Sequence, residues 1–319
     1  MNVLVTGATG YLGRAIVAAL ESAGHAPTAF SRSASGAGLT CRCVDGDIRD
    51  PAAVERAASG CDAICHTAAL VAVWRRQPRE FDEVNVGGLA NVLAAARRAG
   101  VGRIVYTSSF MALPPTGGDA PQPWNDYQRT KAAADRLAGH AVTQGAPLVR
   151  VYPGVIYGPG PMTDGNLVGR MVADHLAGRL PGVLGANRRW SHAYVDDVAA
   201  GHVAALERGR TGGRYQLGGE NARQMRVFEI VRALTGVPLP RRIPAPAAVM
   251  IALVEELRAT LTGRPPLLTV GTVEILDRDW MLDSSDAQRE LGYRMTPLEE
   301  GVRAVVKAVS ARREASAEM

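Results

Sequence analysis

Short apolar runs alternate with segments of helical periodicity over the first half of the chain. Residues 3–5 form an apolar run that ends in a glycine-rich turn, and apolar residues then recur at helical spacing until Gly24. An apolar run bounded by turns predicts a buried strand, whereas a period near 3.6 residues predicts a helix with one buried face. The same criteria predict further strands at 26–30, 41–44, 63–67, 103–108 and 148–152, and further helices at 52–58, 84–100 and 127–144.

This alternation predicts an α/β fold. Parallel strands need long crossover connections, and helices supply them while covering both faces of the sheet. We therefore expect residues 1–157 to form one domain around a doubly wound parallel sheet.

The pattern changes after residue 158. Glycine and proline multiply, as in Gly158-Pro159-Gly160-Pro161, and the regular alternation is lost. A strand and helix within 193–207, followed by a strand at 214–217, predict that residues 192–220 return to the first domain.

The remaining late segments predict a second, smaller region. Residues 222–282 are mostly helical in pattern, with a proline-rich interruption at 238–246. We expect a discontinuous C-terminal region that binds the substrate, followed by a polar tail; the region comprises residues 158–191 and 221–310, and the tail residues 311–319.

The composition is that of an ordinary globular protein. The 319 residues are 47% hydrophobic and 21% charged, which excludes disordered and collagen-like chains. The net charge is +5, yet the arginines are scattered and only 5% of residues are aromatic, so we expect no nucleic-acid partner. The most apolar late stretch, residues 245–254, falls well short of the ~20 residues that cross a bilayer. We expect no membrane partner, no signal peptide and a cytoplasmic location.

Four cysteines raise the question of a metal site. Cys41, Cys43, Cys61 and Cys65 lie near one another in sequence, with His66 adjacent to the last. Their spacing matches no common zinc pattern, and a doubly wound sheet separates the two pairs by two strands. We therefore interpret them as thiols of the sheet and expect no metal.

A glycine-rich turn links the first strand to the first helix. Its sequence is Thr6-Gly7-Ala8-Thr9-Gly10-Tyr11-Leu12-Gly13. The glycines permit a tight turn, the approach of a pyrophosphate to the backbone, and close packing of the helix, whose N-terminal N–H groups attract the anion. The turn and its place in a βαβ unit predict a Rossmann dinucleotide site that includes residues 7 and 9–13.

The end of the second strand bears on which dinucleotide binds. Dinucleotide-binding domains that prefer NAD carry an acid there to hold the ribose, but this chain has Ser31 and Arg32. An arginine at this place accommodates a 2′-phosphate, which favours NADP(H) and leaves NAD(H) as the alternative. Asp47 and Ile48, after the third strand, are placed to cover the adenine.

Tyr127 and Lys131 form the main catalytic candidate. Residues four apart on a helix share a face, and a cation near a phenol lowers its pKa, which suits a general acid. The chain has 34 arginines and only two lysines, Lys131 and Lys307, so a lysine at this spacing stands out. Arginine is bulkier and differently hydrated and would not serve equally well.

Several short motifs occur in an order that resembles a known family. They are the glycine turn, His66-Thr67-Ala68-Ala69, Asn85-Val86-Gly87-Gly88, Thr107-Ser108-Ser109, Tyr127-Gln128-Arg129-Thr130-Lys131 and Pro153-Gly154-Val155-Ile156-Tyr157-Gly158-Pro159. The chain is identified by these motifs as similar to the extended short-chain dehydrogenase/reductase (NAD-dependent epimerase/dehydratase) superfamily. Late segments, including residues 253–269, look more like its dihydroflavonol-reductase-like branch.

This resemblance implies roles for individual residues. Ser109 would hydrogen-bond the reacting oxygen, Asn85 would support the active-site strands, and Lys131 would also anchor the cofactor ribose. The cofactor would further contact Thr67, Ala68, Ala69, Thr107, Tyr127, Pro153, Gly154, Val155 and Ile156.

The segment before Asp197 helps to separate reductases from sugar-nucleotide enzymes. Sugar epimerases normally carry an arginine seven positions before this aspartate, but Trp190 stands there, although Arg189 could substitute. The expected pocket is apolar, which suits a cyclic or aromatic ketone; it comprises Leu70, Val73, Trp74, Phe110, Met111, Trp124 and Trp190.

We therefore predict an NADP(H)-dependent carbonyl reductase acting on a small molecule. The alternative is an NAD-dependent nucleotide-sugar epimerase or dehydratase, and a nucleotide-sensing regulator is disfavoured because Ser109, Tyr127 and Lys131 are all present. The helices at 84–100 and 127–144 could pair across a two-fold axis, so both a homodimer and a monomer remain open.

Overall fold

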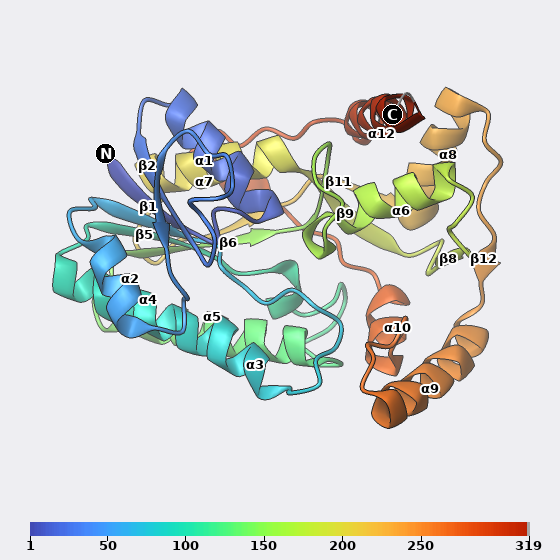
Figure 1. Cartoon of the computed structure of the whole chain (residues 1–319), viewed down its shortest axis with the longest axis horizontal. Coiled ribbons are helices and arrows are strands. Elements are labelled where there is room, and N and C mark those ends of the chain that lie inside the picture. Colours follow the sequence, from blue (N-terminus) through green and yellow to red (C-terminus); the bar gives the residue numbers. More distant parts are fainter. Residues whose placement is uncertain (318–319) are drawn as a thin grey trace.

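A seven-stranded parallel sheet forms the centre of one half of the molecule (Figure 1). The computed structural model describes the backbone of residues 1–317 and the side chains of residues 1–313. The strand order is β10-β6-β5-β4-β1-β2-β3, and every neighbouring pair is parallel. The strands are β1 (Asn2–Thr6), β2 (Ala26–Ser31), β3 (Arg42–Asp45), β4 (Ala63–His66), β5 (Arg103–Thr107), β6 (Leu148–Pro153) and β10 (Arg214–Leu217).

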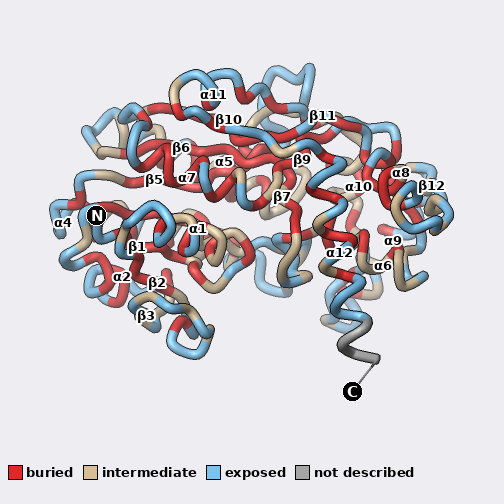
Figure 2. The backbone as a smooth tube through the Cα atoms, turned by 90° about the horizontal axis from the view of Figure 1, so that it is seen from above, coloured by how far each residue is buried: buried red, intermediate tan, exposed pale blue. Residues whose placement is uncertain are grey.

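Helices cover both faces of this sheet. On one face lie α1 (Tyr11–Ser22) and α7 (Val195–Arg208), and on the other α2 (Pro51–Ala58), α4 (Gly88–Ala99) and α5 (Asp126–Thr143). Side chains of β1 alternate accordingly, because Val3 and Val5 join the core under α1 and α7 while Leu4 joins the other core. Figure 2 shows the buried strands between exposed helical surfaces. The predicted doubly wound α/β fold is confirmed.

The helix expected at residues 84–100 differs from its prediction. After the short α3 (Arg79–Phe81), the chain forms a π-helix at Asp82–Gly87 and only then the regular α4. A π-helical turn inserts an extra residue into the hydrogen-bond ladder, and no hydrophobic period in the sequence reveals that insertion.

The second half is built around a smaller sheet. Strands β7 (Val155–Tyr157), β9 (Arg189–Tyr194) and β11 (Glu220–Arg223) take the order β11-β9-β7, so β9 does not join the large sheet, and the chain returns to the large sheet from α7 onward. Its core is mostly aliphatic, with many valines, and also contains aromatic rings, among them Phe110, Trp190, Phe228 and Trp280. The other elements are α6 (Leu167–Leu176), β8 (Val183–Leu184), α8 (Gln224–Thr235), β12 (Arg242–Ile243), α11 (Ser285–Leu291) and α12 (Leu298–Ala317).

The late segments differ from their predictions at two places. Residues 311–317, expected as a polar tail, continue α12, because this helix packs Val302, Val305, Val306 and Val309 into the second core; residues 318–319 lie outside the described part. The helical segment expected at 222–282 is broken by β12 into α8 and a helical pair, α9 (Ala245–Thr262) and α10 (Val270–Leu276), which extends away from both sheets (Figure 1).

Candidate active site

The predicted site residues gather at the carboxyl edge of the large sheet. The glycine turn follows β1, Thr67 follows β4, Ser109 lies two residues past β5, and Gly154 follows β6. In a doubly wound sheet the crevice for the ligand forms at this edge, where the strand order reverses between β1 and β4. The topology therefore brings together motifs as far apart in sequence as Gly7 and Gly154.

The glycine turn has the geometry of a pyrophosphate cradle. Gly7 has φ of 71°, and its N–H donates to the Phe30 carbonyl at 2.9 Å. A Cβ on Gly13 would lie 2.1 Å from the Gly7 oxygen, so α1 can approach the turn only with glycine there. Gly10 precedes α1 without a side-chain cap, which leaves the first N–H groups of the helix free to bind an anion.

Other residues of the turn contact neighbouring parts of the chain. The Thr9 carbonyl accepts a hydrogen bond from Arg14 Nε at 3.2 Å. Tyr11 is buried, and its hydroxyl lies where a Cβ on Gly158 would be 2.9 Å away. Leu12 packs against the core under α1.

The end of β2 presents an exposed arginine. The charge of Arg32 contributes to a lowered pKa of the Asp47 carboxyl, but the largest cause is a hydrogen bond from Arg49. Arg49 binds the two Asp47 oxygens at 3.0 and 2.6 Å. Ser31 is partly buried, and Ile48 is buried beside Gly88. That Asp47 and Ile48 cover the adenine of the cofactor stays a prediction.

Tyr127 lies in the first turn of α5, which begins after the N-cap Asn125. The Asn125 side chain accepts a hydrogen bond from the Gln128 N–H at 2.8 Å and so fixes this turn. Burial raises the pKa of Tyr127 to about 12, and a hydrogen bond with Ser109 opposes the rise. The phenol is therefore neutral at physiological pH.

Lys131 is buried one helical turn further on. Its Nζ donates to the Thr107 carbonyl at 2.7 Å. Burial lowers the pKa of Lys131 to about 8, while the nearby Asp135 carboxylate acts in the opposite direction. We expected the ammonium to lower the pKa of Tyr127, but the pKa is raised, because burial dominates and the ammonium binds the β5 backbone.

The two serines after β5 face different partners. Ser109 Oγ accepts a hydrogen bond from the Met111 N–H at 3.2 Å, at the start of a short 3₁₀ helix (Phe110–Ala112), and bonds Tyr127. Ser108 Oγ donates to Asp135 at 2.9 Å instead. Ser109 is thus the serine beside the phenol. Ser108 instead binds Asp135, the carboxylate near Lys131.

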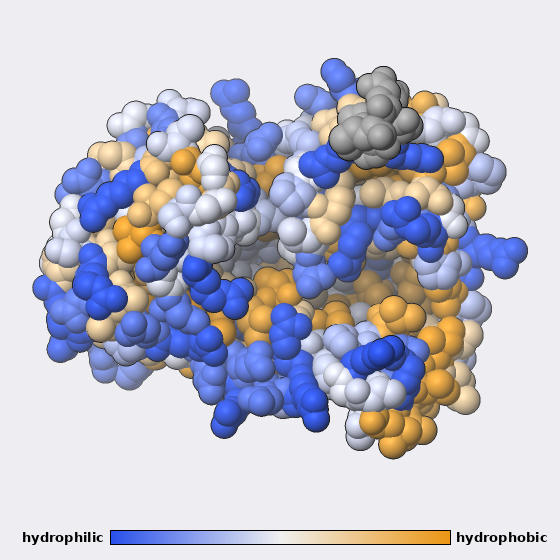
Figure 3. All heavy atoms as spheres, viewed as in Figure 1, coloured by the Kyte–Doolittle hydropathy of each residue, from blue (hydrophilic) through white to orange (hydrophobic). Residues whose placement is uncertain are grey.

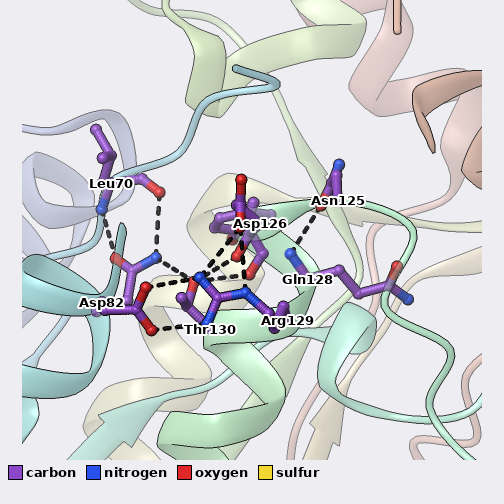
Figure 4. Close-up of polar contacts among 9 residues, drawn as sticks. Leu70, Asp82, Asn125, Asp126, Gln128, Arg129 and Thr130 are labelled. Carbon is purple, nitrogen blue, oxygen red and sulfur yellow. Dashed lines mark hydrogen bonds and ion pairs between the residues drawn. The ribbon is translucent and has the colours of Figure 1, made fainter. Parts of the chain in front are cut away.

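Asn85, in the π-helix, is hydrogen-bonded to the Leu70 segment and to α5. Its Oδ1 accepts from the Leu70 N–H at 2.7 Å, and its Nδ2 donates to Thr130 Oγ1 at 2.9 Å. Beside it, Arg129 binds the Asp82 carboxylate at 2.7 and 2.6 Å (Figure 4). These contacts hold the π-helix and the Leu70 segment against the first turns of α5.

The remaining predicted cofactor residues line the strand ends. Thr67 Oγ1 donates to the Thr6 carbonyl at 2.7 Å, and a Cβ on Gly7 would lie 2.8 Å from the Ala68 backbone. Thr107 Oγ1 is hydrogen-bonded to His202 at 2.8 Å, and the Gly154 N–H donates to the Leu217 carbonyl at 3.1 Å. The neighbours of these residues are only partly exposed or buried, namely Ala69, Pro153, Val155 and Ile156.

The structure separates the residues expected in the substrate pocket. Trp190 is 3% exposed, donates from Nε1 to the Arg278 carbonyl at 3.0 Å and packs on Phe110, which is also buried. These two residues therefore belong to the second core, because β9 and the 3₁₀ helix turn them inward. The other five retain exposed surface, with Val73 the most exposed; they are Leu70, Val73, Trp74, Met111 and Trp124.

Sequence reasoning missed several residues around the site. Asp135 follows Lys131 at helical spacing and forms an ion pair with Arg150 at 3.5 Å, a pattern that could have been found in the sequence. Trp280 and Arg278 pack against Trp124, with the Arg278 guanidinium 4.4 Å from its ring centre. No sequence pattern indicated this contact, because it joins segments about 150 residues apart.

The four cysteines are free. Cys41 and Cys43 lie at β3 and Cys61 and Cys65 at β4, with β2 and β1 between them. In the described part of the chain, no three His, Cys, Asp or Glu side chains are arranged to hold a metal ion. Nor does any helix within residues 1–317 have the length and apolar character needed to cross a membrane.

Comparison with known proteins places this geometry in a family. The model of the NAD dependent epimerase/dehydratase family matches residues 3–218. Sterol demethylase protein B of Methylococcus capsulatus is 35% identical, over 92% of this chain and 93% of its own. The 2-alkyl-3-oxoalkanoate reductase of Stenotrophomonas maltophilia is 32% identical, over 98% of this chain and 100% of its own.

Solved structures show the same fold. UDP-glucose 4-epimerase of Thermotoga maritima aligns with a TM-score of 0.80 at 21% identity, over 98% of this chain and 99% of its own. The resemblance expected from the motifs is confirmed, including its reductase branch, because similar proteins carry dihydroflavonol-reductase and oxoalkanoate-reductase names. This chain belongs to the NAD-dependent epimerase/dehydratase family and is an NAD(P)-dependent oxidoreductase.

Proposed function

We propose that the protein reduces the carbonyl group of a small apolar substrate, a cyclic or aromatic ketone or aldehyde, to an alcohol with NADP(H). The observation that carries this proposal is the neutral Tyr127 phenol, hydrogen-bonded to Ser109 near the end of β5. A phenol with a pKa near 12 keeps its proton until an oxygen of higher basicity forms beside it, which is what protonation of a developing alkoxide requires.

The residues of the chain divide this work. The Gly7–Gly13 turn and the start of α1 would hold the pyrophosphate, and the bound nicotinamide would supply the hydride. Ser109 would orient the carbonyl oxygen by a hydrogen bond, and Tyr127 would donate its proton to that oxygen. Lys131, mostly protonated at pH 7 because its pKa is about 8, would hold the ribose.

An apolar substrate fits the surroundings of the phenol. Met111, Trp124 and Leu70 keep part of their surface exposed near the first turns of α5. The face in Figure 3 is hollowed near its centre, and apolar residues line the hollow. The reductase from Stenotrophomonas is named for a ketone that carries an alkyl chain, which agrees with this polarity.

Replacing Tyr127 tests the reaction. Tyr127→Phe removes the proton donor, and we expect turnover with NADPH to fall at least about 100-fold, within the range of general acid contributions, while NADPH binding is retained. Turnover is measured on a panel of cyclic and aromatic ketones. Ser109→Ala tests the serine that would orient the carbonyl oxygen, and Ser108→Ala is its control. Unchanged turnover in Tyr127→Phe would contradict the mechanism.

The preference for NADP(H) rests on Arg32. The two acids nearest the end of β2 are engaged, Asp47 by Arg49 and Asp45 by Ser35. A 2′-phosphate would therefore meet an exposed guanidinium and no free carboxylate. Arg32→Gln is expected to raise the Kd of NADPH about 10- to 100-fold, the loss of one charge-assisted hydrogen bond, and to leave that of NADH unchanged. Equal effects on both dinucleotides would favour NAD(H).

Sugar-nucleotide chemistry is the alternative, and the family description names epimerases and dehydratases. Exposed Arg189 is the cation nearest to the place of the expected diphosphate-binding arginine, since Trp190 itself is in the core. Thermal stabilisation by a UDP- or GDP-sugar that is lost in Arg189→Gln, with tighter binding of NADH than NADPH, would favour this alternative over carbonyl reduction.

A further inference from the structure

The α9 helix has its large apolar residues on the outside. Seven large apolar side chains between residues 250 and 267 are each at least half exposed, and they account for most of the exposed large apolar residues of the described chain. They are Met250, Ile251, Leu253, Val254, Leu257, Leu261 and Leu267. Figure 3 shows these apolar residues gathered over α9 at the lower right. We call them the α9 face.

The inward side of α9 carries small residues instead. Its buried positions are Ala248, Ala252 and Ala259, and the first two pack near Leu184 and Val273 of α10. A surface helix normally buries its large apolar residues and exposes polar ones. This reversed arrangement cannot result from packing within the chain, and monomers rarely leave an apolar patch of this size exposed.

The acidic side chains near the α9 face have partners within the chain, whereas the arginines at its ends do not have carboxylate partners in the described residues. Glu255 accepts hydrogen bonds from Arg258 at 2.7 Å and from the Leu267 N–H, and Glu256 accepts one from the Val270 N–H at 2.9 Å. Both acids are therefore engaged within α9, the segment that joins it to α10 and the start of α10. Arg241 and Arg242 precede the helix and Arg264 follows it, all exposed. In the described part of the chain these three arginines have no carboxylate partner.

A neighbouring loop extends this surface. Val71 and Val73 are 38% and 45% exposed. The Arg76 guanidinium that follows them approaches Gly263, where an added Cβ would lie 3.3 Å away. The C-terminal end of the α9 face therefore lies beside a fourth exposed arginine, Arg76, which closely follows these two exposed valines in sequence.

A second copy of the chain is a poor occupant of the α9 face. In a two-fold contact through α9, the arginines at the ends of one helix would face those of the other, whether the helices run parallel or antiparallel. The free acids needed to pair with them are missing, because Glu255 and Glu256 are engaged. Like charges would then meet in a desolvated interface, at a cost in affinity.

We propose that the α9 face lies in the interfacial layer of an anionic membrane. The large apolar residues would enter the boundary between headgroups and acyl chains, and the flanking arginines would contact lipid phosphates, as in interfacial amphipathic helices. We expected no membrane partner because residues 245–254 are too short to cross a bilayer, but a helix lying in the interface needs no such length. The proposal does not depend on the reaction catalysed.

Vesicle sedimentation with the full chain tests this proposal. We expect co-sedimentation with vesicles of phosphatidylcholine and phosphatidylglycerol, much weaker binding to phosphatidylcholine alone, and loss of binding at high salt. Replacing both exposed leucines, Leu257→Ser and Leu261→Ser, should lower the partition coefficient at least about 10-fold, since burial of each contributes to binding. Met295→Ser, at an exposed site on another surface, is the matched control.

The charge contribution is tested separately. Arg241→Gln, Arg242→Gln and Arg264→Gln together should lower the partition coefficient on anionic vesicles roughly 100-fold. The same change at exposed Arg97, Arg136 and Arg232 should have little effect. Two results would overturn the proposal: no binding to anionic vesicles, or a dimer in solution that the leucine substitutions dissociate, because a second copy would then cover the α9 face.

Discussion

The two halves of this molecule bury different kinds of residue. Around the large sheet, Asn85, Ser108, Ser109, Lys131 and Asp135 are all at least nine-tenths buried, and each has a hydrogen bond or ion pair. Buried polar groups cost free energy unless they are paired, so these pairs offset the cost of burial and fix the positions of the reactive groups.

The second half buries a cluster of touching aromatic rings among aliphatic side chains. The Phe110 ring contacts those of Trp190 and Trp280, with ring centres 5.7 and 5.4 Å away. Such rings contribute large apolar area and shape, and their burial needs few polar partners. Under the proposed function, the chemistry depends on the first half and the volume offered to a substrate depends on the second. Substitutions in the two halves should therefore affect different measurements.

The largest effect is expected at the glycine turn of the first half. Gly13→Ala places a Cβ 2.1 Å from the Gly7 oxygen, and because this neighbour is backbone, α1 must move. The N–H groups that would bind the pyrophosphate move with it, so we expect NADPH affinity, measured by titration calorimetry, to fall about 100-fold or more.

Stability provides the control for this substitution. Overpacking at Gly13 should lower the free energy of unfolding by about 1–3 kcal/mol. Gly36→Ala, at a glycine with no neighbouring atom within 4 Å, should change both quantities little. Normal NADPH binding by Gly13→Ala would show that the cofactor does not use this turn.

Regular periodicity explains why the first half was the more predictable one. The strands from β1 to β6 and the topology followed from apolar runs and glycine turns, and the loops at the strand ends then placed Gly7, Tyr127 and Lys131 near one edge. The sequence pattern could not predict the direction of the Lys131 side chain. Whether its ammonium faces Tyr127 or the Thr107 carbonyl depends on side-chain packing.

In the second half, sequence patterns failed for a physical reason. Its short strands pair with partners far along the chain, as when the Trp190 backbone bridges to Trp280. An apolar residue there looks the same in sequence whether it lines a pocket or fills the core. Trp190 and Phe110 were therefore expected in the pocket but lie in the core, whereas Trp124 and Met111, also expected in the pocket, keep partly exposed surface.

Trp190→Phe provides an intermediate effect and tests the role of the second core. The substitution removes the hydrogen bond from Nε1 to the Arg278 carbonyl and leaves a small cavity. We expect the free energy of unfolding, measured in urea, to fall by about 2 kcal/mol while the KM of the substrate changes less than about two-fold. Trp74→Phe, at a partly exposed ring, should change the KM of the substrate and leave the free energy of unfolding nearly unchanged. A changed KM with unchanged stability in Trp190→Phe would return this residue to the pocket.

The smallest effect separates the two lysines, one in each half. Lys131 is buried with a pKa of about 8, below its ordinary value of 10.5. Between these values the unfolded chain binds more protons than the folded chain, so the free energy of unfolding rises with pH. Lys131 should therefore add about 1 kcal/mol of stability between pH 7 and pH 9.

Urea unfolding at both pH values measures this contribution. Lys131→Met should lack the rise that wild type shows, because its buried side chain carries no proton to lose. Lys307 is exposed on α12, and Lys307→Met should keep the wild-type rise. If all three proteins show the same pH dependence, the Lys131 ammonium is not destabilised by burial. Burial of the charged Lys131 would then not lower the free energy of unfolding of the first half. The two halves would differ only in how their side chains pack.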